Sequence, residues 1–182
     1  MKRKNITSEM MMDYIAQALL LLMKQKSYQD ITIGEITKKA GVNRSTYYRH
    51  FETKESIIRF YLDSIMQEYQ DVFHEKHSLD FGVYIQTMFE TFYSRSEELL
   101  RIHDAGMSFL LLDVLNERFH FGNIVEKASK AQQFKASYHI GGIYNNLLLW
   151  FSHRMSETPA EMTKITLSYR PENSLTLFNI DE

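Results

Sequence analysis

The sequence predicts an all-α protein of about nine helices, and three observations support this fold class. The 182 residues include only 2 Pro and 7 Gly, which argues against a turn-rich β fold and against a long disordered region. Apolar residues recur every three to four positions along most of the chain, as they do on amphipathic helices. Helix-capping residues stand at the start of several such segments, and glycine or proline follows the end of others.

The first two helices are indicated by apolar spacing and by capping residues. Apolar side chains at helical spacing predict a helix over residues 11–23. Thr32 and Glu35 then have the spacing of a capping box, in which the hydroxyl and the carboxylate satisfy each other's backbone N–H groups. We expect this second helix to end at Gly41, because glycine adopts the left-handed conformation that closes a helix.

The next two helices follow at once. Asn43 is a suitable N-cap for a short helix over residues 44–50, which Phe51 ends. Thr53 is placed to cap a long amphipathic helix that reaches about residue 73. Together these segments predict a helix-turn-helix unit in residues 1–55, followed by a second helical domain in residues 56–182.

The second domain contains further helix signals. We expect Ser78 to cap one helix, and Ser94 with Glu97 to form a capping box at the start of another. A buried helix over 109–115, a loop over 119–122 and a long helix over 129–156 containing Gly141 and Gly142 should follow. Thr158, Pro159 and Glu161 start a last helix, which ends by 169–170 and precedes a loose tail over 171–182.

Composition excludes several classes of protein. The chain has no Cys, which excludes disulfides, thiolate zinc sites, iron–sulfur clusters and cysteine nucleophiles, and favours a reducing, intracellular setting. No apolar run approaches the ~18 residues that a membrane-spanning helix requires. Glu9, Asp13 and Gln17 interrupt the only segment that resembles a signal peptide. We therefore expect a cytoplasmic protein without a membrane partner.

Charge is distributed unevenly, although the net charge is only −2. Residues 1–55 carry 10 Lys/Arg and 6 Asp/Glu, a net charge of +4, whereas the remainder of the chain carries −6. A basic head on an acidic body favours a polyanionic partner for the head.

The helix expected over residues 44–50 has an unusual composition, Arg-Ser-Thr-Tyr-Tyr-Arg-His. Almost all of its side chains donate hydrogen bonds, and few of its residues are good helix formers. Short polar groups, guanidinium forks and tyrosine hydroxyls are what base edges and phosphates in a major groove require. Tyr47 and Phe51, four residues apart, remain to pack against the head. The segment therefore reads as a DNA-recognition helix.

Several motifs fall in register here: the segment Ile31–Ile36, the Ala40-Gly41-Val42 turn, Thr46-Tyr47-Tyr48, His50-Phe51 and Lys54-Glu55. Over about residues 8–60 they resemble the DNA-binding domain of TetR-family transcriptional regulators. The resemblance implies a homodimer with a three-helix DNA-binding unit and a C-terminal domain that binds a ligand and forms the dimer. It also implies repression at a palindromic operator in double-stranded DNA, released by a small apolar effector.

The resemblance implies a set of site residues. The DNA contacts that it implies are Thr32, Gly34, Asn43, Arg44, Ser45, Thr46, Tyr48, Arg49, His50 and Lys54. Arg44, Ser45 and Thr46 are expected to face the groove. Lys54 is expected to pair a phosphate near the positive end of its helix. The basic arm over residues 2–4 either reaches an adjacent minor groove or stays unbound.

The second domain is similar over residues 140–162 to a compact subgroup of regulators related to dihydroxyacetone kinase operons. Gly141 and Gly142 permit another backbone to approach, so the last two long helices suit a dimer seam. The abundance of aromatic residues and Met suggests an apolar pocket, although such residues more often form ordinary core. The candidate ligand-binding residues are Phe92, Met107, Phe109, Tyr144 and Trp150.

Two other functions remain open from the sequence. The second domain would make the chain a co-regulator if it bound a protein partner instead of a small molecule. His74, His77 and His103 would form a metal site if they met, but solvation at helix ends explains them as well. The chain has no Gly-rich phosphate loop, HExxH pair or nucleophile elbow. We therefore expect neither an enzyme nor a cofactor.

Overall fold

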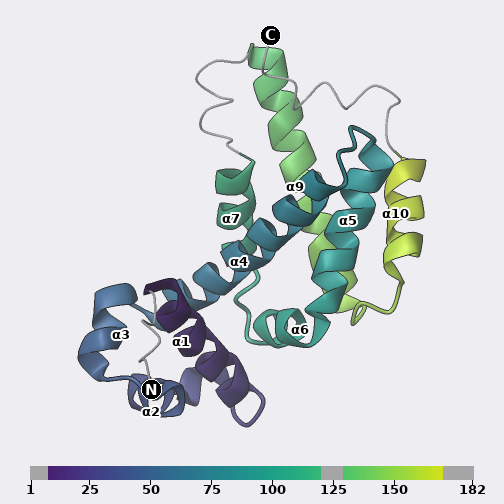
Figure 1. Ribbon diagram of the computed structural model, residues 1–182. Helices are drawn as coiled ribbons and strands as arrows, with labels where there is room; N and C mark the ends of the chain where they lie inside the picture. Colours follow the sequence, from purple (N-terminus) through teal and green to yellow (C-terminus); the bar gives the residue numbers. More distant parts are fainter. Residues whose placement is uncertain (1–7, 120–128, 170–182) are drawn as a thin grey trace.

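Residues 8–119 and 129–169 are described by a computed structural model, which contains nine α-helices and no β-strand in these ranges (Figure 1). The predicted fold class and helix number are thereby confirmed. In chain order the helices are α1 (Ser8–Met23), α2 (Ile33–Ala40), α3 (Arg44–His50), α4 (Lys54–Glu75), α5 (Phe81–Ser94), α6 (Ser96–Asp104), α7 (Leu110–Arg118), α9 (Lys130–Ser152) and α10 (Pro159–Ser168), with a short 3-10 helix, Tyr28–Asp30, before α2. No described helix is both long and apolar enough to cross a bilayer.

Helices α1, α2 and α3 form an N-terminal head, at the lower left of Figure 1. Ile15 and Leu19 of α1, Ile36 of α2 and Tyr47 of α3 are all buried completely and belong to the hydrophobic core. Each helix thus turns its apolar side inward, as the amphipathic spacing predicts. The opposite side of α3 is left to solvent.

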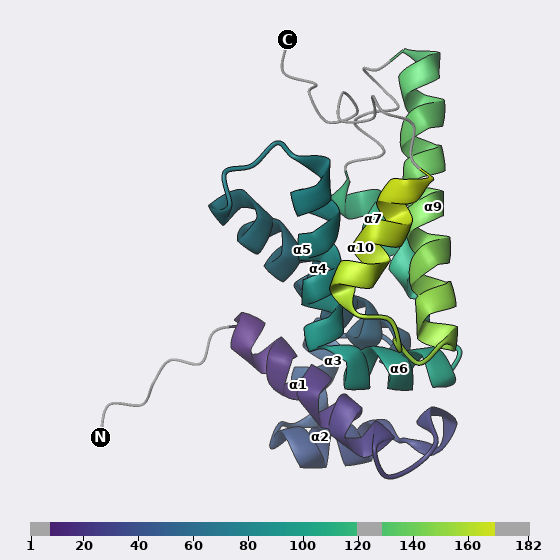
Figure 2. The same cartoon turned by 90° about the vertical axis from the view of Figure 1, so that its right-hand side faces the viewer.

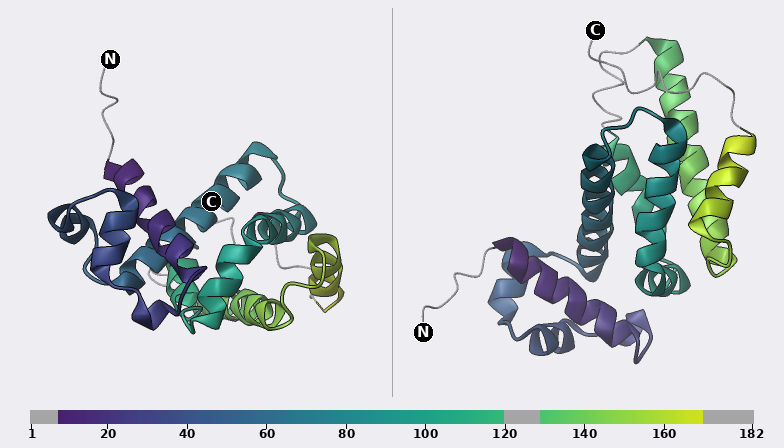
Figure 3. Two further views of the ribbon diagram at one scale, coloured as in Figure 1. Left: turned by 90° about the horizontal axis from the view of Figure 1, so that it is seen from below. Right: turned by 45° about the vertical axis from the view of Figure 1, so that its right-hand side comes forward.

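Helix α4 connects the head to the body without interruption. It packs on α1 at one end and on α5 and α7 further along (Figures 1 and 3). Because the helix begins at Lys54, the domain boundary predicted at residues 55 and 56 lies within its first turn. The head also touches the body through an ion pair of 3.2 Å between Lys24, just after α1, and Glu97 of α6.

The body is a group of helices in which α10 lies along α5 (Figures 1 and 2). Trp150 of α9 is 1% exposed and connects α9 with α5 and with the segment before α10. Its ring centroid lies 5.3 Å from that of Phe89 and 5.9 Å from that of Tyr93, both on α5. Its Nε1 donates to the carbonyl of Glu157, just before α10, at 3.0 Å. This residue therefore fixes the C-terminal end of α9 against its neighbours.

Most of the predicted helix ends are confirmed. Thr32, Thr53 and Thr158 each accept a hydrogen bond from the backbone N–H three residues later, and Gly41 ends α2 with φ 69°. The last helix ends at Ser168, as expected. Residues 120–122 of the predicted loop and the tail over 171–182 lie outside the described residues.

Three predicted boundaries are wrong. Asp80, not Ser78, caps α5, with its Oδ1 accepting from the N–H of Val83 at 2.9 Å. Ser94 starts no helix, because it closes the last turn of α5 by donating to the carbonyl of Thr91 at 2.7 Å. Helix α9 ends at Ser152, four residues earlier than predicted. The backbone at Arg154 and Met155 is left-handed there, which a helix cannot accommodate.

Candidate nucleic-acid interface

The N-terminus of α2 is held by a closed set of hydrogen bonds. Thr32 Oγ1 accepts from the N–H of Glu35 at 3.3 Å, and the Glu35 carboxylate accepts from the N–H of Thr32 at 2.9 Å. Lys26 Nζ donates to both oxygens of this carboxylate, at 2.6 and 2.8 Å. The Lys26 ammonium, followed by the Thr32 N–H, lowers the pKa of Glu35 to about 2. The carboxylate therefore stays charged at neutral pH and orders the first turn of α2.

Gly41 determines how α3 leaves α2. Its left-handed backbone, with φ 69°, lets the N–H of Val42 donate to the carbonyl of Thr37 at 3.0 Å. A side chain at this position would be strained. Asn43 occupies the N-cap position of α3, as predicted, but its side chain makes no capping hydrogen bond. The exposed Asn43 amide therefore does not serve the first turn of α3.

The inner side of α3 is anchored by aromatic packing. The exposure of Tyr47 is 0%, and its ring centroid lies 6.2 Å from that of Phe51. The ring centroid of Phe51 in turn lies 5.8 Å from that of Phe60 on α4. Tyr47 is thus a packing residue, as predicted. A short helix with few good helix formers is held in place by this contact instead of by its own propensity.

The outer side of α3 carries polar and cationic side chains. Arg44, Ser45, Tyr48 and Arg49 are exposed, whereas Thr46 and His50 are half-buried. We call these residues, with Asn43 and with Thr32 and Gly34 of α2, the polar face of the head.

Arg44 lies across the start of α2. A Cβ built at Gly34 would come within 3.0 Å of Arg44 Nη2, closer than almost all real contacts of this kind. The missing side chain at Gly34 therefore makes room for the guanidinium group. This approach brings the first turn of α2 and the first turn of α3 into one surface.

The start of α1 adjoins this surface. Ser8 Oγ lies 3.4 Å from His50 Nδ1, at the C-terminal end of α3. The chain therefore enters the described region beside the polar face. Residues 2–4, for which a basic arm is predicted, lie outside the described residues.

Lys54 makes its contacts within the head, and its predicted phosphate contact stays a prediction. Lys54 Nζ donates to the carbonyl oxygens of Tyr28 and Ile31, each at 2.8 Å, and to that of Gln29 at 3.4 Å. It also lies 4.4 Å from the centroid of the Tyr28 ring. The ammonium group is thus engaged within the head, where a phosphate contact would compete with three carbonyls.

The residues predicted to bind a ligand occupy different environments. Phe92 and Trp150 are 0% and 1% exposed and belong to the core, whereas Met107 and Tyr144 are half-buried. Phe109 is 54% exposed just before α7. The burial of Phe92 and Trp150 is what ordinary packing requires. A common ligand pocket for these five residues stays a prediction.

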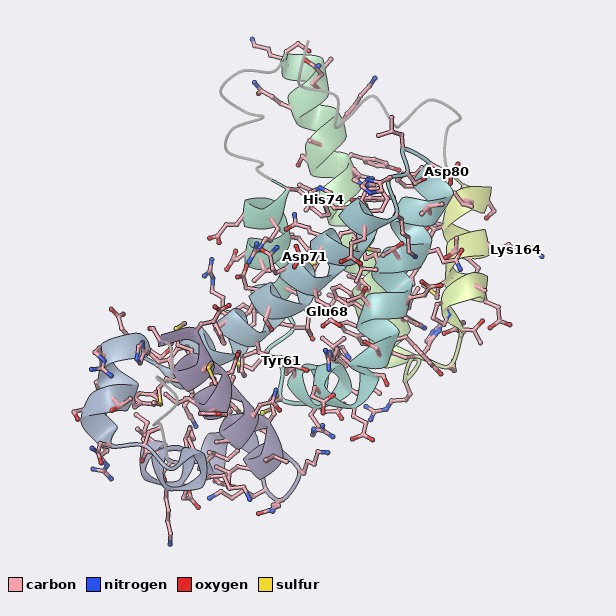
Figure 4. All side chains as sticks on the ribbon, in the orientation of Figure 1. Tyr61, Glu68, Asp71, His74, Asp80 and Lys164 are labelled. Atoms are coloured by element: carbon pink, nitrogen blue, oxygen red, sulfur yellow. The ribbon has the colours of Figure 1, made fainter. Side chains whose placement is uncertain are left out.

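The three histidines considered as metal ligands do not form a cluster. His74 lies in the last turn of α4 (Figure 4) and His77 follows that helix. His103 lies on α6, with its Nδ1 3.0 Å from Ser108 Oγ. Within residues 8–119 and 129–169, no group of three or more His, Asp or Glu side chains is placed to hold a metal ion.

A second surface feature lies on α9. Phe134, Tyr138 and Leu149 are 78%, 85% and 57% exposed, which is unusual for large apolar side chains. Spacings of three or four residues put Gly142 and Asn145 between them on the same side of the helix. A Cβ at Gly142 would meet nothing within 4 Å. We call these five residues the α9 stripe, and it extends onto the half of α9 that projects beyond α5 (Figures 1 and 2).

Sequence reasoning missed two residues that support the polar face. Lys26 lies nine positions before Glu35, and Ser8 lies 42 positions before His50. Neither separation corresponds to a helical or turn spacing, so no local pattern links these pairs. In the sequence, only the excess of basic residues in the head pointed to Lys26.

Comparisons with known proteins bear on the same region. Residues 15–59 match the family model described as bacterial regulatory proteins, tetR family. Over 101 residues the chain is 24% identical to the biofilm operon icaADBC HTH-type negative transcriptional regulator IcaR of Staphylococcus epidermidis. This alignment covers 51% of each chain, so the chain spans about half the length of this curated relative. The family match ends before residues 140–162, whose subgroup resemblance stays a prediction. The family match covers the helix-turn-helix of the head, which is therefore similar to the tetR family of bacterial regulatory proteins.

Proposed function

We propose that the protein is a homodimeric transcriptional repressor that binds a palindromic operator through α3 and leaves it when a small apolar effector binds the body. One observation carries this proposal. Tyr47 anchors α3 from the inside, while Arg44, Ser45, Tyr48 and Arg49 are exposed on its outside. A rigid short helix with hydrogen-bond donors on its free side suits the major groove.

The polar face supplies both kinds of DNA contact. The Arg44 guanidinium can donate two parallel hydrogen bonds to guanine, and Thr46 lies two residues further along the same helix. The first turn of α2 carries the positive end of a helix dipole, which suits a phosphate oxygen beside Thr32 and Gly34. Tyr48 and His50 provide further phosphate or base contacts.

The α9 stripe supports a dimer. Contiguous exposed apolar side chains on a monomer mark an interaction surface. A two-fold axis would place the stripe against its own copy, with Gly142 letting the two helices approach closely. Ile165 and Tyr169, 46% and 58% exposed at the end of α10, would extend the seam.

Repression is proposed from the similarity to IcaR, which is a negative transcriptional regulator. An effector in the body would release DNA by favouring a dimer in which the two heads are wrongly spaced. The shift can be no larger than the difference in effector affinity between the two states. Helix α4 runs without interruption from the head into the body and would transmit this change.

The proposal is tested with Arg44→Ala and a duplex selected from a random pool. We expect this variant to bind the selected duplex about 1–3 kcal/mol less tightly, because base-edge hydrogen bonds are lost. Arg154→Ala removes the same charge from an exposed site of the body and serves as the control. Equal affinities of the wild-type protein and Arg44→Ala, measured by fluorescence anisotropy, would contradict the assignment of α3.

A further inference from the structure

Gly34 occupies a position where the backbone does not require glycine. It is the second residue of α2, and glycine within a helix is unfavourable because it loses more conformational freedom on folding than other residues. Gly41 has the left-handed backbone that favours glycine, with φ 69°, but Gly34 does not. Local conformation therefore gives no reason for glycine at position 34, and its surroundings have to be considered.

The surroundings of Gly34 include a side chain from α3. A Cβ built at Gly34 would lie 3.0 Å from Nη2 and 4.0 Å from Cζ of Arg44, and 3.8 Å from Oγ1 of Thr32. Separations of 3.8 and 4.0 Å are ordinary van der Waals contacts, so only the guanidinium nitrogen is too close for a Cβ. The Arg44 guanidinium thus lies against the backbone of Gly34, and any other residue at position 34 would push it away.

The contact with Gly34 leaves the donors of Arg44 unused. The side chain is exposed, and within residues 8–119 and 129–169 its guanidinium takes part in no hydrogen bond or ion pair. A guanidinium carries five N–H donors in a fixed planar fork. These donors are available to a group from outside the described chain, while the contact with Gly34 restricts the direction in which the fork points.

The direction of the fork matters for the recognition of a base pair. A guanidinium that donates to both O6 and N7 of guanine has to approach the base edge in one orientation, and such a contact discriminates against other bases by roughly 5- to 150-fold. A long side chain also loses less conformational entropy on binding when it is already placed. Arg44 therefore meets a base pair in an orientation that depends on Gly34.

We propose that Gly34 is a positioning residue for base recognition. Its missing side chain places the Arg44 guanidinium over the first turn of α2, and this placement sets which base pair Arg44 reads. The inference deepens the DNA-binding function proposed above and rests on it. Because Gly34 acts through Arg44, a change at position 34 alters base preference only while Arg44 is present.

The first test follows the Nε–Hε group of Arg44 by NMR in the free wild-type protein and in Gly34→Ala. We expect Gly34→Ala to shift this resonance and lower its order parameter, because the added Cβ pushes the guanidinium away from α2. The Nε–Hε group of the exposed Arg49, on the same helix, is the control and should not change. An unchanged Arg44 resonance would overturn the proposal.

Unfolding in urea separates this role from a packing role of Gly34. The midpoint should stay equal or rise in Gly34→Ala, since alanine is the better helix former and the only close atom is the far end of a flexible side chain. A lower midpoint would show that the fold itself needs glycine at position 34 and would overturn the proposal.

The second test is a double-mutant cycle of the wild-type protein, Gly34→Ala, Arg44→Ala and the double variant, each used to select duplexes from a random pool. The base pair whose enrichment is lost with Arg44→Ala is the one that Arg44 reads. We expect Gly34→Ala to weaken enrichment at this base pair by about three- to tenfold, a part of the discrimination of a two-bond contact, and to leave the other positions unchanged. In the Arg44→Ala background, Gly34→Ala should change neither affinity nor sequence preference.

Two results of the cycle would overturn the proposal. Equal enrichment by the wild-type protein and Gly34→Ala at the base pair of Arg44 would show that position 34 does not set the reading. A loss of affinity from Gly34→Ala that is equal in the wild-type and Arg44→Ala backgrounds would show that position 34 acts on DNA without Arg44. If no duplex were selected at all, the proposed function itself would fail, whereas the Nε–Hε comparison would still decide whether Gly34 places Arg44.

Discussion

Truncation of Tyr138 tests whether the α9 stripe is the dimer seam. An aromatic side chain offers about 150–250 Å² of surface, and Tyr138 is 85% exposed, so a partner could cover on the order of 150 Å². At about 25 cal/mol per Å² this is roughly 4 kcal/mol per side chain. A two-fold dimer loses the contact twice, and only part of buried area becomes affinity. We therefore expect Tyr138→Ser to raise the dimer Kd by roughly two to three orders of magnitude.

Sedimentation equilibrium over a range of protein concentrations measures this Kd. Circular dichroism should show unchanged helix content, because the Tyr138 side chain is exposed to solvent in a single chain. Tyr14→Ser is the matched control, since Tyr14 is an exposed tyrosine on α1, in the head, with 45% exposure. A Kd for Tyr138→Ser equal to that of the control would remove α9 from the interface and refute the area argument.

Three further changes test other contacts. Gly142→Leu should weaken the dimer without destabilising the single chain, which has open space at this position; retention of the full dimer in ultracentrifugation would count against the seam. Asp63→Asn should lower the free energy of unfolding by about 1–2 kcal/mol in urea, because Arg118 donates to this carboxylate from Nε, at 2.5 Å, and from Nη2; unchanged stability would show that the pair contributes nothing. Glu35→Gln should remove a pH dependence: the folded pKa of about 2 lies below the ordinary 4.5, so the contribution of Glu35 is complete above pH 4.5 and is lost as the pH falls toward 2. The free energy of unfolding is measured between pH 2 and 4.5. An equal dependence on pH in the wild-type protein and Glu35→Gln would contradict the Lys26–Glu35 contact.

The helices of the head could be predicted almost completely because their signals are local. Thr32 and Glu35 are three residues apart, and Gly41 and Thr53 stand directly at helix ends, so the sequence contains both partners of each motif. The exposed residues of α3 also follow from the helical repeat within this one helix. The geometry of Lys54 did not follow, because its acceptors lie 23–26 residues earlier in the chain.

Prediction was weaker in the body for the same reason. Ser78 and Asp80 both have capping side chains, and the cap is Asp80, which directly precedes the buried Phe81. Phe92 and Phe109 are the same residue type, yet Phe92 is in the core and Phe109 is exposed. Apolar composition shows that a side chain can be buried but does not show against which element, so a pocket could not be built from it.

The most direct test of the central claim, that the outer side of α3 reads a DNA duplex, is selection of bound duplexes from a random pool by the wild-type protein. We predict recovery of an inverted repeat whose half-site centres are separated by about 34–36 Å, one helical turn of DNA. The absence of any enriched sequence at low salt, where ionic contacts to phosphates are strongest, would contradict the claim.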